Sequence, residues 1–86
     1  MRLVPDDAAT LDSRGFTYLK MRQWPQAIAD YDAALKVAPK QAPSLFGRGV
    51  ARLRTGDVSG GNADIAAAIA IDDTIAERLA ERGVVR

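Results

Sequence analysis

Adjacent carboxylates are the residues of this chain that could do chemistry most directly. Asp6-Asp7 and Asp72-Asp73 are such pairs, and paired carboxylates can hold a divalent cation or act together as general acid and base. Both pairs, however, stand where helices are expected to begin. A carboxylate there accepts hydrogen bonds from free backbone N–H groups and complements the helix dipole. We therefore interpret both pairs as helix caps, and we expect no metal ligands among them.

The other chemical motifs are incomplete. The chain has no histidine and no cysteine, which removes the commonest general base, the strongest nucleophile and the usual transition-metal ligands. Ser59 lies among glycines as some protease serines do, but it has no histidine to activate it. Gly47-Arg48-Gly49 could be half of a phosphate-binding loop, yet it falls inside a predicted helix with no strand before it. We expect a protein that is not an enzyme and that needs no cofactor.

Composition narrows the classes of partner. The 86 residues are 48% hydrophobic and 27% charged, as in one small soluble unit. A net charge of +1 gives no strong field for nucleic acid or for an anionic membrane, so neither is expected as a partner. Met1 to Pro5 is no signal peptide, and no apolar stretch approaches the length of a membrane span. These features favour the cytoplasm without fixing the location.

The elements that must position these residues repeat along the chain. Leu-x-x-Arg-Gly occurs three times, at Leu11–Gly15, Leu45–Gly49 and Leu79–Gly83, and successive glycines are 34 residues apart. A fixed period of this size is typical of stacked helical repeats. The arginines Arg14, Arg48 and Arg82 could form a basic ladder for acidic ligands. We favour a structural role, because a long arginine stem can cover the apolar surface beside it.

Apolar spacing predicts five helices. The first should run over residues 7–21, and a turn at residues 23–25 should lead to a second helix that ends before Pro39. A third is expected from Pro43 to about Arg54. The turn at residues 55–57 leads to a fourth, whose stripe includes Ile65. Thr74 and Glu77 have the spacing of a capping box, which predicts a fifth helix from residue 74 to about 83.

These columns resemble the tetratricopeptide repeat, a helical hairpin of 34 residues. In the first copy the residues at the family's positions are Gly15, Tyr18, Trp24, Ala27, Tyr31, Ala34 and Pro39. The second copy keeps Gly49 and Ala68 but has Arg52, Gly61, Ile65 and Asp73 where the family has a tyrosine, an alanine, an aromatic and a proline. The resemblance implies an all-α fold of antiparallel helix-turn-helix hairpins, stacked as a short right-handed superhelical solenoid of about five helices.

The same resemblance divides residues 1–86, taken as one domain, into segments. Residues 1–7 occupy the columns that end a preceding repeat, residues 8–41 and 42–75 are two full repeats, and residues 74–86 form a C-terminal capping helix. The chain would then be part of a longer array that ends here, because terminal repeats of solenoids are atypical.

The resemblance also implies a function, since the first helices of such hairpins line a concave groove that binds proteins or peptides. The residues mapped to this groove are Asp12, Phe16, Lys20, Phe46, Val50 and Arg54. Their apolar strip with a basic edge would suit a peptide with apolar anchors and an acidic flank. Two alternatives stay open: the strip packs against the fifth helix or a neighbouring repeat, or the open end of the stack pairs with a second copy to form homo-oligomers.

Overall fold

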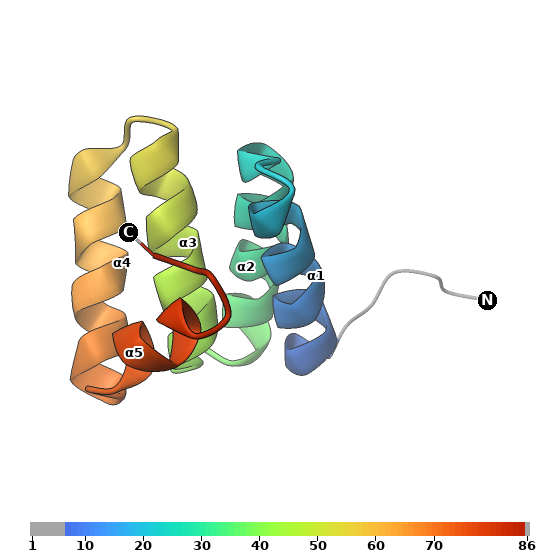
Figure 1. Cartoon of the computed structure of the whole chain (residues 1–86). Coiled ribbons are helices and arrows are strands. Elements are labelled where there is room, and N and C mark those ends of the chain that lie inside the picture. The colour runs from blue at the N-terminus through green and yellow to red at the C-terminus, as the bar shows by residue number, and fades with distance from the viewer. Residues whose placement is uncertain (1–6, 86) are drawn as a thin grey trace.

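Helices alone make up the secondary structure of residues 7–85, the part of the chain that the computed structural model describes. In order they are α1 (Ala8–Lys20), α2 (Trp24–Val37), α3 (Ala42–Arg54), α4 (Val58–Ile71) and α5 (Ile75–Ala80) (Figure 1). The fold is all-α, and successive helices pack as antiparallel neighbours in a compact globule with a radius of gyration of 11.8 Å. The expected cap Asp6 and the segment 1–6 lie outside the described residues.

Helix starts follow the capping chemistry expected of the sequence. Asp7 precedes α1 and accepts the backbone N–H of Thr10 at 3.1 Å, which confirms its role as a cap. Asp57 does the same for α4 by accepting the N–H of Gly60 at 2.9 Å. Proline occupies the first turn of α2 and of α3, where no hydrogen-bond donor is needed. Because Trp24 already belongs to α2, the first turn covers residues 21–23 rather than 23–25.

The fifth helix differs from its prediction at both ends. The capping box at its start is absent: Thr74 makes no side-chain cap, and its hydroxyl and N–H instead donate to Asp72, at 2.7 and 3.0 Å. The helix ends at Ala80, not near residue 83. Gly83 takes a φ of +85°, and the N–H of Val84 donates to the Leu79 carbonyl at 2.9 Å. This is a Schellman motif, which closes a helix when a glycine follows it in the left-handed conformation.

Two close approaches hold the helices together. The Tyr31 ring is only 2% exposed and lies against both Gly15 and Gly47, so it joins the first hairpin to α3. In the second hairpin the two helix backbones meet, because an added methyl group at Gly49 or at Gly61 would come within 3 Å of the carbonyl oxygen of the other. A side chain at either glycine would push α3 and α4 apart.

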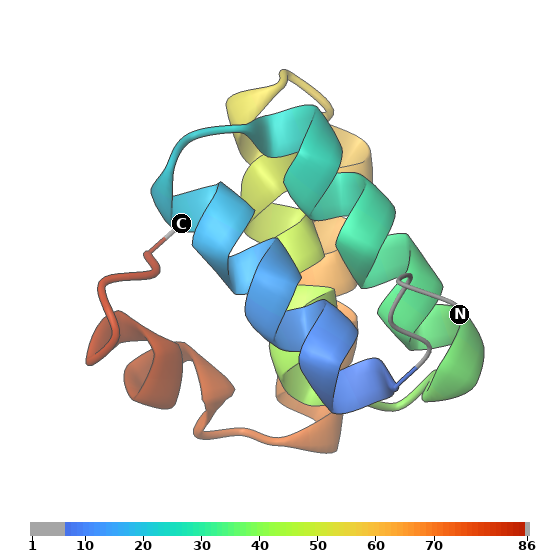
Figure 2. The same cartoon turned by 90° about the vertical axis from the view of Figure 1, so that its right-hand side faces the viewer.

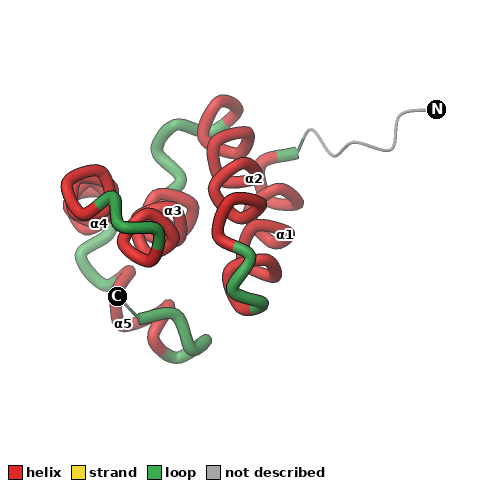
Figure 3. The backbone as a smooth tube through the Cα atoms, turned by 90° about the horizontal axis from the view of Figure 1, so that it is seen from above, coloured by secondary structure: helices red, strands yellow, loops and turns green. Residues whose placement is uncertain are grey.

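The two hairpins lie next to each other, and the C-terminal segment lies against one side of both. Figure 3 shows the pair α1 and α2 beside the pair α3 and α4. In Figure 2 the segment after α5 runs up along the molecule toward the turn between α1 and α2. Val84 is 3% exposed and belongs to the same buried cluster as Leu19 and Val50. The three regions thus share one hydrophobic core and enclose the pocket described next.

Candidate functional site

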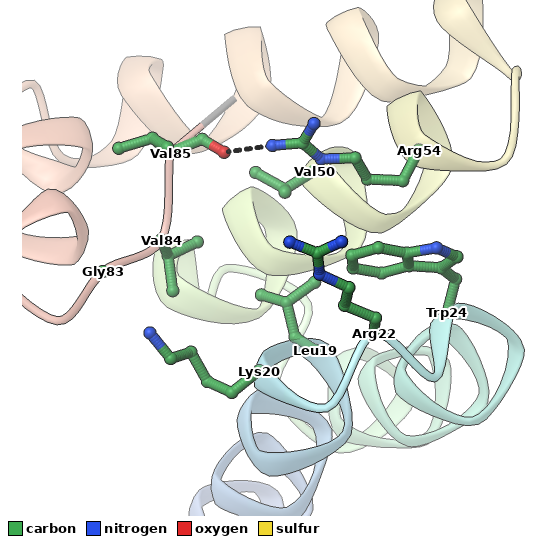
Figure 4. Close-up of a pocket in the computed structure, with 9 residues that line it drawn as sticks. All are labelled: Leu19, Lys20, Arg22, Trp24, Val50, Arg54, Gly83, Val84 and Val85. Carbon is green, nitrogen blue, oxygen red and sulfur yellow. Dashed lines mark hydrogen bonds between the residues drawn. The ribbon is translucent and has the colours of Figure 1, made fainter.

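The larger of two pockets among the described residues lies where the end of α1, the start of α2, the second half of α3 and the C-terminal segment meet (Figure 4). It has a volume of about 340 Å³ and opens to solvent. Its lining residues are Leu19, Lys20, Arg22, Trp24, Val50, Arg54, Gly83, Val84 and Val85. The volume falls in the range of small-ligand sites, and the mixture of aliphatic, aromatic and charged side chains is typical of them.

Positive charge is the main electrostatic feature of this pocket. Lys20, Arg22 and Arg54 are exposed side chains on its wall, while no carboxylate side chain belongs to the lining. Three cations at one site contrast with a net charge of +1 for the whole chain. The half-buried indole of Trp24 adds an aromatic surface on which an apolar group or a cation can pack. The site therefore favours anionic ligands that also carry apolar groups.

The C-terminal segment already occupies part of this site. Lys20 Nζ donates to the backbone carbonyl of Arg82 at 3.2 Å, and Arg54 donates to that of Val85 at 3.4 Å. Figure 4 shows Arg54 extended toward this carbonyl. Val84, between the two contacts, is buried to 3% exposure. The pocket thus holds a short non-helical peptide segment by one aliphatic side chain and two cation-to-carbonyl hydrogen bonds.

The turn that presents Arg22 has an uncommon backbone. Arg22 has a φ of 60°, and it is the only non-glycine residue with positive φ among residues 7–85. The N–H of Gln23 donates to the Tyr18 carbonyl at 2.9 Å, so α1 ends in a Schellman motif with arginine at the position that usually holds glycine. The equivalent turn 34 residues later has Gly56 there, with a φ of +94°. Arginine at such a position costs about 1 kcal/mol relative to glycine.

The structure brings together three of the six residues predicted to form the groove. Lys20, Val50 and Arg54 line the pocket. Phe46 and Val50 are only 2% and 3% exposed and belong to the core that includes α5, so they offer almost no free surface. Phe16 is partly buried against that core.

Asp12, the sixth of these residues, is engaged within the fold. Its carboxylate accepts the hydroxyl of the fully buried Ser44 on α3 at 2.7 Å. Burial raises the pKa of this carboxyl group above its ordinary value of 3.8, although the Ser44 hydrogen bond and the charge of Arg82 act in the opposite direction. Asp12 therefore joins α1 to α3 and does not line the pocket.

Sequence reasoning missed two lining residues, Arg22 and Trp24. Both were assigned to a turn or to the repeat pattern and not to a site. A signal did exist, because Arg22 occupies the column of Gly56, and an arginine in place of a helix-terminating glycine suggests a role for its side chain. The burial of Val84 had no comparable local signal.

Two of the periodic arginines form ion pairs with carboxylates 16 residues further along the chain. Arg14 donates to Asp30 through two nitrogens, each at 2.7 Å. Arg48 does the same with Asp64 at 2.8 Å, and it also donates to Asp32 of α2 at 2.8 Å. These hydrogen bonds raise the pKa of both guanidinium groups. The geometry supports a structural role for these two arginines, through ion pairing more than through coverage of apolar surface.

No known family, curated protein or solved structure matches this chain. Among the described residues, no helix is long and apolar enough to cross a membrane, and no group of three acidic side chains could hold a metal ion.

Proposed function

We propose that this protein is a peptide-binding interaction module whose ligand is an extended acidic peptide with an aliphatic anchor. The observation that carries the proposal is the pocket with Lys20, Arg22 and Arg54 on its wall and no carboxylate among its lining side chains. Clustered cations around a partly apolar cavity attract a peptide that combines negative charges with apolar side chains.

The C-terminal segment supports the extended form of this ligand. Val84 fills the apolar part of the pocket, and the carbonyl groups of Arg82 and Val85 accept from Lys20 and Arg54. A ligand with carboxylates in place of these carbonyl groups would make stronger, charge-assisted hydrogen bonds. The ligand would therefore compete with the segment for the same two cations, and binding would release residues 83–85.

The 34-residue period and the packing of the two hairpins support a short tetratricopeptide-like solenoid as the scaffold. In the proposed scaffold, α1 and α3 line the concave side on which the pocket lies. The right-handed superhelical stacking and the repeat boundaries at residues 8–41 and 42–75 belong to this proposal. The pocket argument needs only the positions of the four segments that line it.

Trp24 provides a direct test because it is the only tryptophan of the chain and it lines the pocket. We expect a peptide of alternating aspartate and valine to change the indole emission saturably, and a lysine-valine peptide of equal length to leave it unchanged. Raising the salt concentration should weaken the acidic complex, because the pocket cations are exposed to solvent.

A charge-reversal pair of variants assigns the binding to the pocket. Arg54→Glu should weaken the acidic peptide about tenfold, by loss of one attraction and gain of one repulsion. Lys36→Glu makes the same change in net charge on an exposed residue of α2 outside the pocket, and it should bind as the unaltered chain does. Equal loss in both variants, or binding of the basic peptide, would overturn the proposal.

A further inference from the structure

Helix α4 presents an uncharged face at one edge of the molecule. Asp64, its only charged residue, is buried against α3, whereas Val58, Ile69 and Ile71 are 57%, 36% and 45% exposed. In Figure 1 no other helix lies beyond α4 on that side. A helix that is apolar around most of its circumference is usually covered on both sides.

The two hairpins show what covers such a helix. The buried residues of α2 are Ala27, Asp30, Tyr31 and Ala34, and those of α4 are Gly61, Asp64, Ile65 and Ala68, each 34 positions later. Both helices therefore pack in the same way on their hairpin partners. However, α2 also packs against α3. Ile28 and Asp32 are half-buried in α2, whereas the equivalent Asn62 and Ala66 of α4 are exposed.

The complementary difference appears between α3 and α1. Gly47 and Ala51 are buried in α3, where Arg48 reaches across to Asp32 of α2. The equivalent positions of α1, Ser13 and Thr17, are exposed. Helix α1 therefore has an uncovered face at the columns where α3 meets α2, and α4 has an uncovered face at the columns where α2 meets α3.

We infer that a second copy of this chain stacks head to tail on the first, with α1 of one copy against α4 of the other, and that this contact repeats the α2–α3 packing. The two faces lie toward opposite ends of the molecule (Figure 1), so neither can reach the other within one chain. This inference does not rest on the proposed peptide site.

Side-chain size and charge fit this contact. A methyl group on Gly47 would collide with the Tyr31 ring, so that column admits only glycine within the chain. In the column of Tyr31, α4 has Ile65, which is fully buried and does not extend to the surface, so the larger Ser13 can be accommodated. In the column of Asp32, Ala66 would face Arg14 with no charge to repel it.

A contact of this type does not close on itself. Because the two faces differ, each added copy leaves one of each kind free, and association continues into open chains instead of stopping at a dimer. The weight-average mass in sedimentation velocity should therefore rise above the 9.2 kDa of one copy, and continue to rise with protein concentration.

A mixing experiment tests the direction of stacking. Ser13→Trp blocks the α1 face, and Ala66→Lys sets a charge on the α4 face opposite Arg14; both residues are exposed, so both variants should keep the fold. Each variant alone should be monomeric, and an equal mixture should form one-to-one dimers from the two unblocked faces. A mixture that stays monomeric, or an unaltered chain that stays monomeric at all concentrations, would overturn the inference.

Ala66→Asp is the matched control for charge at the same site. It restores the carboxylate that Asp32 offers to Arg48 inside the chain, so association should become about threefold tighter through Arg14. Weakening by aspartate and lysine alike would refute the predicted α1–α4 register. Arg54→Glu, which lies in the peptide pocket, should leave the stacking unchanged, so the failure of either proposal can be recognised separately.

Discussion

Arg22 has a backbone conformation that costs stability, and its side chain lines the pocket. The same turn in the second hairpin uses Gly56, which adopts positive φ without steric cost. Backbone strain of this kind is commonly retained where a side chain has a function. The strain and the placement of Arg22 in the pocket together connect the local structure to the proposed binding.

The Arg22→Gly variant should therefore gain stability and lose binding. We expect the free energy of unfolding in urea to rise by about 0.5–1 kcal/mol, because glycine removes the left-handed strain. Affinity for the acidic peptide should fall, since one of three pocket cations is lost. A variant that is less stable, or that binds the peptide with undiminished affinity, would contradict this account of the turn.

Asp12 predicts a pH effect of definite sign. Burial raises the pKa of its carboxyl group in the folded state, so the folded protein binds this proton more tightly than the unfolded chain. Its contribution to stability is therefore greatest at low pH and is lost as the pH rises from about 3.8 through the folded pKa. The group is charged and half-buried at neutral pH, at a cost to the fold.

The Asp12→Asn variant isolates this effect. Asparagine keeps an oxygen acceptor for the Ser44 hydroxyl but has no charge to bury. Its urea midpoint should exceed that of the unaltered chain at neutral pH, and the difference should shrink as the pH falls toward 3 and Asp12 becomes protonated. A difference that grows with acidification would show that the Asp12 charge stabilises the fold.

Among the elements, α3 is the centre of the fold, because Arg48 connects it to both neighbours. This side chain donates to Asp64 on α4 and to Asp32 on α2. Asp64 also accepts from Arg52 at 2.9 Å, so three donors converge on one buried carboxylate. The corresponding pair in the first hairpin, Arg14 with Asp30, has a more exposed arginine.

Removing these two carboxylates should have unequal effects on stability. Asp64→Ala should lower the free energy of unfolding by about 2–3 kcal/mol, since it leaves Arg48 partly buried with fewer acceptors. Asp30→Ala should cost about 1–2 kcal/mol, because water can solvate Arg14 in its place. Urea unfolding followed by circular dichroism measures both. An equal cost, or a larger one for Asp30→Ala, would be inconsistent with Arg48 as the central connection.

The sequence predicts the helices well wherever local signals and packing agree. The third Leu-x-x-Arg-Gly motif shows the limit. In α1 and α3 the helix continues past the glycine because a partner helix packs there: Gly15 lies against Tyr31, and Gly49 against α4. Among the described residues no helix follows α5, and Gly83 ends the motif in a turn instead. One local pattern thus takes two structures because tertiary contacts outweigh helix propensity.

For the molecule as a whole, the period predicts two helical hairpins, and the structure has them. The candidate pocket was predicted only in part, through Lys20, Val50 and Arg54. Its other walls depend on a turn and on a C-terminal segment that returns to α1 from residues more than 60 positions away, as the contact between Lys20 and Arg82 shows. Helical periodicity carries no information about such a return, because it reports only contacts within and between successive helices.

The location of peptide binding tests the central claim most directly. Amide and indole resonances of the isotope-labelled chain can be followed by NMR during titration with the aspartate-valine peptide. We predict that the largest shifts fall on Lys20, Arg22, the Trp24 indole and Arg54, and that the Val84 amide changes as its segment is displaced. Shifts centred on α4, or no saturable shifts at all, would contradict the assignment of the pocket as the binding site.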